Sequence, residues 1–173
     1  MAQLFFSKFD VTRQVFFRTA LSYGVVNLKP IVPGHVLVVP NRVVHRLSDL
    51  THEEVSDLFG SVQKIGGVVE KVYKANALTV AVQDGEAAGQ SVPHLHVHIL
   101  PRKWVDFDGH NDRVYPALEA NEEDLSKGLP RLEQQSEARQ RAEIKVDDAA
   151  REPRSLEDME KEASWLSEFF KAP

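Results

Sequence analysis

Three histidines stand at alternate positions in the stretch SVPHLHVHILPR, residues 91–102, and the whole sequence has only seven. Successive side chains of an extended strand point to opposite faces, so His94, His96 and His98 would share one face of a strand while Leu95 and Val97 faced a core. An imidazole titrates near neutrality and can act as a nucleophile, an acid–base group or a metal ligand. The pattern predicts a reactive site rather than a solvated, histidine-rich edge strand.

The residues before this stretch predict the strands and turns that hold it. Residues 1–50 are rich in β-branched and aromatic side chains, above all in QVFFRTA, LSYGVVNL and HVLVV. Pro33 and Gly34 form a turn before the last of these segments, and Pro40 closes it. A further strand, ALTVAVQDG, leads to a loop over 86–93 and then to the histidines.

A long helix is predicted over residues 51–74. Thr51 and Glu54 have the spacing of a capping box, and apolar residues then recur at intervals of three and four. Gly66 and Gly67 weaken the helix locally, and we read them as a sign of close packing on a sheet. The order of the elements predicts an α+β fold in which this helix lies across an antiparallel sheet.

The whole sequence divides into three predicted parts. These are a folded domain over 1–119, a charged mobile insert over 120–154, and a C-terminal helix over 155–173. Sixteen of the 35 residues in the insert are Asp, Glu, Lys or Arg, which indicates a solvated segment with at most transient helix in RLEQQSEARQRAEIKV. Ser155 and Asp158 cap the last helix, whose apolar stripe predicts docking on the domain or on a second subunit.

Composition restricts the class of protein. The net charge of −5 and the pI of about 5.8 argue against a general nucleic-acid binder. The sequence has no cysteine, which excludes disulfides and thiolate metal sites and favours a reducing compartment. Its first residues lack the features of a secretory signal, and no apolar run approaches the ~18 residues of a membrane span. We therefore expect an intracellular protein without nucleic-acid or membrane partners.

The order His-φ-His-φ-His-φ-φ over residues 94–100, with φ apolar, resembles the signature of the histidine triad (HIT) family. NLKPIVPGHVLVVPNR, VQDGEAAGQSVPHLHVHILPRK and DFDGHND are similar to segments of its Fhit branch, the dinucleoside polyphosphate hydrolases. The likeness runs in order from about residue 4 to 115 and returns in the last helix. It implies a HIT-like fold, a homodimer with the sheet continued across two subunits, and a location in the cytoplasm and also the nucleus.

The resemblance also implies a reaction. Fhit-like enzymes cleave diadenosine triphosphate to AMP and ADP, and the middle histidine, here His96, attacks the α-phosphorus to give a covalent adenylyl-histidine. The backbone carbonyl of the first histidine, here His94, fixes the tautomer of the nucleophile. His98 lies near the phosphate, where as a cation it stabilises charge. His35 resembles a supporting histidine behind the site, and an ordinary core histidine is an equally open interpretation.

Substrate contacts follow from the same resemblance. Asn27 matches a ribose ligand and Gln83 a substrate-contacting amide, while Lys8 is a weaker candidate for a base or phosphate contact. The family implies no tightly bound cofactor, with Mg²⁺ or Mn²⁺ accompanying the polyphosphate. The loop before the histidines offers backbone N–H groups to an anion, and Gln90 matches a contact to the phosphate chain. This loop comprises Gly89, Gln90, Ser91 and Val92.

Two other functions stay open at this point. The histidines could hold zinc in a zinc-dependent hydrolase, with His35 or Asp84 as a further ligand, although neither has a supporting spacing. Alternatively, the chain is a nucleotide-binding signalling module in which the bound complex is the output. The length of the phosphate chain and the identity of the base have no visible determinant in the sequence.

Overall fold

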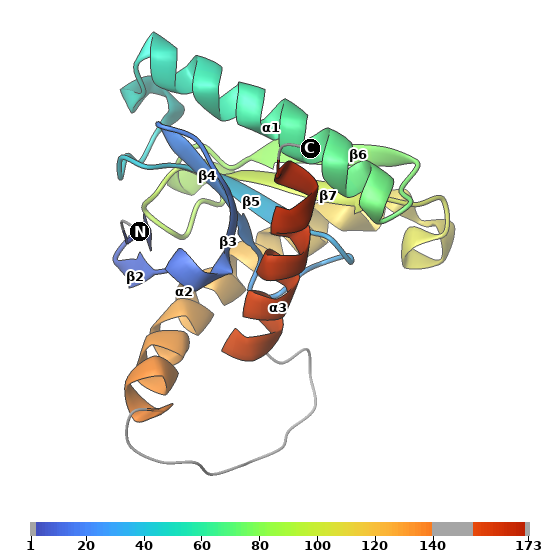
Figure 1. Ribbon diagram of the computed structural model, residues 1–173. Coiled ribbons are helices and arrows are strands. Elements are labelled where there is room, and N and C mark those ends of the chain that lie inside the picture. Colours follow the sequence, from blue (N-terminus) through green and yellow to red (C-terminus); the bar gives the residue numbers. More distant parts are fainter. Residues whose placement is uncertain (1–2, 140–153, 172–173) are drawn as a thin grey trace.

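The computed structural model describes residues 3–139 and 154–171. A five-stranded antiparallel sheet forms its centre, in the order β3-β4-β5-β7-β6 (Figure 1). The strands are β3 (Val15–Arg18), β4 (Ser22–Val26), β5 (Val36–Pro40), β6 (Ala77–Val82) and β7 (Val97–Arg102), and a small hairpin of β1 (Phe5–Phe6) and β2 (Phe9–Asp10) precedes them. The predicted α+β class and antiparallel sheet are confirmed.

Helix α1 (His52–Val72) crosses one face of the sheet, where it packs on β4, β5 and β7 (Figure 1). The predicted capping box is present, because the Thr51 hydroxyl accepts from the Glu54 N–H and the Glu54 carboxylate accepts from the Thr51 N–H. A Cβ on Gly66 would lie 2.8 Å from Leu78 of β6, so close packing explains this glycine. Gly67 has open space around it, and packing does not explain it.

The strand register separates the two faces of the sheet. Leu37 pairs with His98 across β5 and β7, and Val36 pairs with Ile99. Directly paired residues of antiparallel strands point to the same face, and neighbours along a strand point to opposite faces. His98 therefore shares its face with Leu37. Gly24, whose Cβ would lie 2.8 Å from Ile65 of α1, belongs to the other face.

Helix α2 (Val114–Arg139) lies on the side of the sheet away from α1, and it differs from the prediction (Figure 1). The expected boundary between residues 119 and 120 falls inside this helix. Residues 120–139, which we predicted as part of a mobile charged insert, belong to it, and 140–153 lie outside the described residues. The physical reason is burial, because one side of the helix enters the core and the histidine site. Among the residues whose burial the structure describes, the buried ones include Val114, Leu118, Asn121, Glu122, Leu125 and Leu129.

Helix α3 (Leu156–Ser167) begins at the predicted Ser155 cap and docks on its own chain. Its buried side chains, Met159, Ala163 and Leu166, face the 3₁₀ turn η1 (Thr12–Gln14), β3 and β4. The Phe170 ring packs at a tilt against Phe16 and Phe17, with centroids 5.7 Å and 5.0 Å apart. The apolar stripe of this helix predicts docking on the domain or on a second subunit, and the structure shows the first of these.

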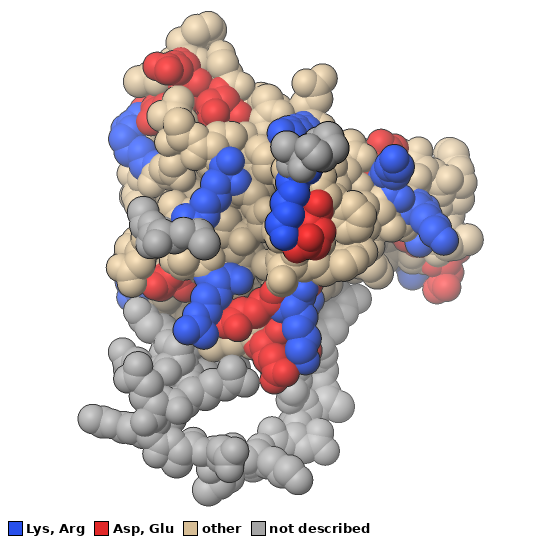
Figure 2. Space-filling view, in the orientation of Figure 1, with Lys and Arg blue, Asp and Glu red and all other residues tan. Residues whose placement is uncertain are grey.

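The surface carries charge of both signs. Lys and Arg side chains are interspersed with Asp and Glu on the face shown in Figure 2, as the mixed composition leads one to expect. Within the described part of the chain, no helix has the length and apolar character needed to cross a membrane.

Candidate active site

His94 is held by two main-chain groups before β7 begins. The Ser7 N–H donates to its Nδ1 at 2.9 Å, and its Nε2 lies 2.9 Å from the Pro40 carbonyl. Nδ1 accepts, so the hydrogen-bond partners assign the proton to Nε2, which donates to Pro40. Burial lowers the pKa of His94 to about 4, although the bond to Pro40 opposes this shift. His94 is therefore a neutral, buried ring.

His96 is oriented by the chain that carries it. Its Nδ1 lies 2.7 Å from the carbonyl oxygen of His94, which is an acceptor only, so Nδ1 is the donor. The lone pair of a neutral ring then lies on Nε2, which faces the site. The Phe6 ring packs edge-on against His96, with centroids 5.1 Å apart at 85°. This geometry is the one that the resemblance implied for a nucleophilic His96.

His35 and His98 form a chain of hydrogen bonds behind the nucleophile. The Ile31 N–H donates to His35 Nδ1 at 3.2 Å, so His35 carries its proton on Nε2, which lies 3.0 Å from His98 Nδ1. His98 consequently carries its own proton on Nε2 and presents it to the site. Burial lowers the pKa of both rings, and the neighbouring histidines lower them further. At His98 the hydrogen bond with Glu122 and the charge of that carboxylate oppose the lowering of the pKa. The geometry makes His98 Nε2 a hydrogen-bond donor to the site, and the expected cation stays a prediction.

Gly34 explains why His35 reaches this position. The residue has a φ of +83°, and a Cβ there would lie 2.5 Å from the Tyr73 ring, so the predicted Pro33-Gly34 turn requires glycine. The turn delivers His35 to the start of β5, where the ring is 1% exposed and fully hydrogen-bonded. A buried ring with both nitrogens bonded agrees with a supporting histidine and equally with an ordinary core histidine.

Glu122 of α2 completes the site, although its charged surroundings in the sequence predict a solvated residue. Its Oε1 lies on His96 Nε2 and 2.9 Å from His98 Nε2, and its Oε2 accepts from the Ser91 N–H at 3.0 Å. The side chain is buried among these donors. A signal was present: Val114, Leu118, Leu125 and Leu129 are spaced as one helical stripe, and position 122 lies on it.

The carboxyl group of Glu122 is ionised. Burial alone would raise the pKa of Glu122, but hydrogen bonds from His96 and His98, the electrostatic effect of His96 and the Ser91 N–H hold it well below its ordinary value. His96 Nε2 is in direct hydrogen-bond contact with the Glu122 carboxylate. In this arrangement Nε2 is not available to a substrate.

The loop before the histidines presents fewer groups than predicted. The Gly89 and Gln90 N–H groups bond back to the turn over residues 85–86, which leaves the Ser91 N–H to face the site. Gln90 does not face the histidines: its amide accepts from the Gly85 N–H and donates to the His45 carbonyl, which fixes the loop itself. Val92 is a buried core residue.

Three other expected contacts lie around the site. Asn27 is fully buried, accepts from the Lys29 N–H at 2.9 Å and donates to Asn121 of α2 at 3.2 Å. Gln83 has a buried Oε1 that receives no hydrogen bond from the described residues, so it can still accept one from a ligand. The Lys8 ammonium lies 5.4 Å from the centroid of the Phe9 ring, and it is the neighbouring Ser7 that contacts His94.

The atoms that could bind a metal ion are not those of His35 or Asp84, which the sequence suggested as further zinc ligands. His35 uses both ring nitrogens within the protein, and Asp84 is bound by Arg46 and the Leu47 N–H. One donor atom from each of His96, His98 and Glu122 lies within 4.8 Å of the others. Two imidazoles and a carboxylate are a ligand set that suits zinc.

A family model described as the HIT domain matches residues 8–105. The fold, the three alternating histidines and this match agree, and the chain belongs to the histidine triad family. It is 53% identical over 174 residues to a bis(5'-nucleosyl)-tetraphosphatase [asymmetrical] of Schizosaccharomyces pombe, a match that covers 97% of this chain and 94% of that protein.

Two further relatives narrow the assignment to the Fhit branch of the family. A bifunctional bis(5'-adenosyl)-triphosphatase/adenylylsulfatase FHIT of Arabidopsis thaliana is 47% identical over 158 residues, covering 91% of this chain and 78% of that protein. The crystal structure of Plasmodium falciparum diadenosine triphosphate hydrolase in complex with Cyclomarin A has a TM-score of 0.67 and 26% identity, covering 98% of this chain and 85% of that one.

Proposed function

We propose that this chain hydrolyses diadenosine triphosphate and related dinucleoside polyphosphates to AMP and ADP through a covalent adenylyl-histidine at His96. The relatives named above act on bis-nucleosyl polyphosphates, which supports the substrate class. The observation that carries the proposal is the bond between His96 Nδ1 and the His94 carbonyl at 2.7 Å. This bond keeps the proton of a neutral ring on Nδ1, so that the lone pair on Nε2 can attack the α-phosphorus.

The first step transfers an adenylyl group. His96 Nε2 attacks the α-phosphorus, a P–N bond forms, and the P–O bond to the leaving ADP breaks. The His98 Nε2–H and the Ser91 N–H, which point to the same place, donate hydrogen bonds to the phosphoryl oxygens as negative charge develops. The His94 carbonyl stabilises the imidazolium that His96 becomes, because it accepts the Nδ1 proton.

The second step is hydrolysis of the adenylyl-histidine. A water oxygen attacks the same phosphorus from the side that ADP has left, the P–N bond breaks, and AMP departs with the new oxygen. His96 returns to the neutral form, and the water gives up a proton to solvent. Two in-line displacements give net retention of configuration at the α-phosphorus, whereas direct attack by water in one step gives inversion.

Stereochemistry tests this route. A chiral α-phosphorothioate of the dinucleotide, hydrolysed in labelled water, should give an AMP analogue with retained configuration, and an acid-labile nucleotide should be trapped on His96 during turnover. A matched reaction with His96→Ala should yield no trapped nucleotide. Net inversion without an adduct would refute the covalent mechanism.

Phosphate chain length and leaving group are separate questions. The relatives include a tetraphosphatase and an adenylylsulfatase as well as triphosphatases, so substrates with three and four phosphates, adenylyl sulfate and adenylyl amidates should be compared in one assay. We propose the triphosphate as the preferred substrate. A higher kcat/KM for the tetraphosphate would reassign the preference without changing the chemistry at His96.

A divalent cation, Mg²⁺ or Mn²⁺, enters this proposal with the polyphosphate, and no metal is tightly bound to the protein. A metal on His96 Nε2 would remove the lone pair that the first step needs. The donor set of His96, His98 and Glu122 nevertheless makes a zinc-dependent hydrolase the second candidate. Elemental analysis of protein purified without a histidine tag separates the two, because one zinc per chain that is needed for turnover would favour the zinc enzyme.

We further propose a homodimer, found in the cytoplasm and also in the nucleus, for which the Fhit branch provides the support. Light scattering at micromolar concentration should report twice the 19.5 kDa mass of the chain. A monomer at that concentration would contradict the dimer, and a fluorescent fusion confined to another compartment would contradict the location. A signalling role, in which the complex with substrate is the output, predicts that a slow-turnover variant keeps the biological effect.

A further inference from the structure

The segment 121–129 of α2 contacts the same groups that the proposed function assigns to the substrate. Glu122 lies on His96 and His98, and Asn121 lies on Asn27, the expected ribose ligand. Leu125 and Leu129 enter the apolar part of the site next to Phe6. These contacts come from one side of a single helix, about two turns long.

The contact at His96 excludes catalysis. Its Nε2 must form the P–N bond, and a carboxylate oxygen of Glu122 already holds that atom. The Ser91 N–H, the loop group that faces the site, is bonded to the second carboxylate oxygen, and the Ser91 hydroxyl is bonded to Glu122 as well. A planar carboxylate and a tetrahedral phosphate both present anionic oxygens, and these oxygens accept hydrogen bonds from the same donors. Glu122 and a substrate phosphate therefore cannot occupy the site together.

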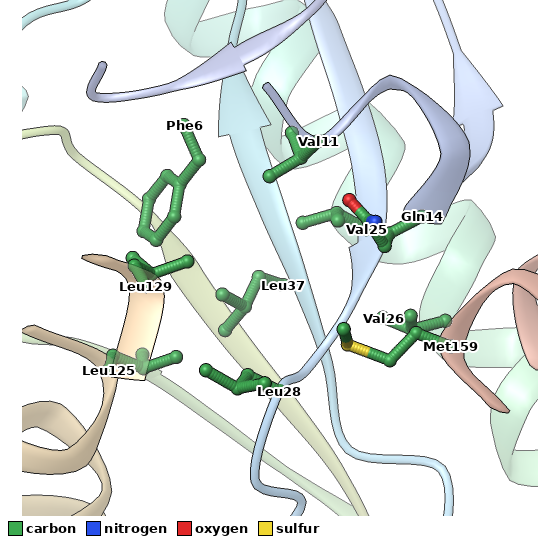
Figure 3. A pocket seen from close by; sticks show the side chains of 10 residues that line it. All are labelled: Phe6, Val11, Gln14, Val25, Val26, Leu28, Leu37, Leu125, Leu129 and Met159. Carbon is green, nitrogen blue, oxygen red and sulfur yellow. The ribbon is translucent and has the colours of Figure 1, made fainter. Parts of the chain in front are cut away.

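The apolar contact excludes the base. Figure 3 shows Leu125 and Leu129 pointing from α2 toward Phe6, Leu28 and Leu37, with the sheet behind them. With the helix in place, the cavity that remains has a volume of about 20 Å³, room for about one water molecule and none for a nucleobase. Leu37 pairs with His98 on the same face of the sheet, so this cavity adjoins the histidines.

Helix α2 has features that favour its displacement from the histidine site. Gly128 and Pro130 lie within it, and both are poor helix formers. Glu119 and Tyr115 of its first turns are exposed. The contacts of Asn121, Glu122, Leu125 and Leu129 with the groups of the site help to hold this segment, and a ligand that offers the same groups competes for these contacts.

From this juxtaposition we infer that segment 121–129 is an autoinhibitory mimic of the nucleotide: Glu122 stands in for the phosphate, Asn121 covers the ribose ligand, and Leu125 and Leu129 fill the apolar cavity beside the histidines, to which we assign the base. A nucleoside polyphosphate must displace the segment to bind, and the inference rests on the proposed function for the identity of that ligand. The affinity observed for a nucleotide is then its intrinsic affinity reduced by the fraction of chains with an open site.

A charge-matched pair of variants tests the mimic. Glu122→Ala removes the buried carboxylate, and Glu119→Ala removes an exposed one from the same helix, three residues earlier. We expect Glu122→Ala to bind AMP at least ~10-fold more tightly than wild type, because even one of the charge-assisted hydrogen bonds it loses would shift the closed population by about that factor. Glu119→Ala should bind as wild type does. Equal or weaker binding by Glu122→Ala would overturn the inference and give Glu122 a role in holding the ligand.

A second readout needs no nucleotide. Diethyl pyrocarbonate acylates an imidazole nitrogen whose lone pair is free, and mass spectrometry locates the product on His96. The reaction at His96 should be faster in Glu122→Ala than in Glu119→Ala. If neither variant nor wild type binds or cleaves nucleotides while this difference holds, the proposed function fails and the occlusion stands; unchanged reactivity in an active enzyme refutes the occlusion alone.

A reversible lock covers the case in which Glu122→Ala does not fold. A Cβ on Gly128 would lie 3.9 Å from Leu28 Cγ, and the chain has no native cysteine, so oxidation of Leu28→Cys with Gly128→Cys can link only these two positions within a chain. The oxidised form should neither bind AMP nor turn over, and reduction should restore both, while reductant leaves wild type unchanged. AMP binding of equal affinity in the oxidised and reduced forms would refute the displacement.

Discussion

Acid should destabilise this protein through His94 well before its carboxylates titrate. The folded ring has a pKa of about 4 against an ordinary value of 6.5, because burial disfavours the charged form. A lowered pKa on a base means that the unfolded chain binds more protons between these two values. The stability contributed by the neutral ring is therefore present above pH 6.5 and is lost as the pH falls toward 4.

The magnitude follows from the two pKa values. Between pH 7 and pH 5 the unfolded ring takes up most of a proton and the folded ring about a tenth of one, which costs about 2 kcal/mol of unfolding free energy. The pKa of His35 and of His98 is also lowered by burial, so they add to the loss with the same sign. Glu122, whose pKa is lowered as an acid, contributes stability that is lost only below about pH 4.5.

Urea denaturation at pH 7 and pH 5 measures this loss, with His94→Gln as the matched variant. A glutamine amide can accept from the Ser7 N–H and donate to the Pro40 carbonyl, as His94 does, but it does not titrate. The variant should lose about 2 kcal/mol less than wild type between the two pH values. Identical losses in both proteins would show that His94 is not held neutral by burial.

Three further substitutions test the site and the core. His96→Ala should abolish turnover and retain binding of a substrate analogue, because Asn27 and the other ligands remain; near-normal hydrolysis would disprove its role as nucleophile. His98→Ala should reduce kcat by about 10²–10³ through loss of one oxyanion donor, with an unchanged rate as the contrary result. Asp57→Ala should lower the free energy of unfolding, measured in urea, by about 1–3 kcal/mol. The hydroxyls of Thr19 and Ser22 would lose the carboxylate acceptor that they share, at 2.7 Å and 2.6 Å. A loss below about 0.5 kcal/mol, typical of a surface change, would argue against that network.

The strands, the long helix and the last helix were predictable because each carries a local signature. Thr51 with Glu54 marks a helix start without reference to the rest of the fold, and Ser155 with Asp158 does the same. The alternation of the three histidines marks the site for the same reason, although β7 begins only at Val97, so that His94 is positioned by Ser7 and Pro40 rather than by a sheet ladder.

Glu122 was not predictable in the same way, because its partners are distant in the sequence. Charge density around it indicates a solvated segment, and burial reverses that interpretation only when His96, His98 and Ser91 supply donors from 24 to 31 residues away. Gln90 is the opposite case, because the sequence predicts a substrate contact that the structure does not show. A residue type that suits a phosphate contact is used instead to close its own loop, and the competing partner, the His45 carbonyl, is 45 residues away.

The docking of α3 has a consequence for the order in which the protein can be made. This helix covers η1 and β3, and the Arg154 N–H donates to the Leu28 carbonyl, so residues near 160 complete a layer that residues 12–28 begin. A ribosome that has delivered the sheet, α1 and the histidines has still not delivered the cover for Phe16, Phe17 and Val25. Until residues 156–170 emerge, that apolar surface is open to chaperones and to other nascent chains. The three histidines are therefore synthesised well before the helix that covers this part of the core.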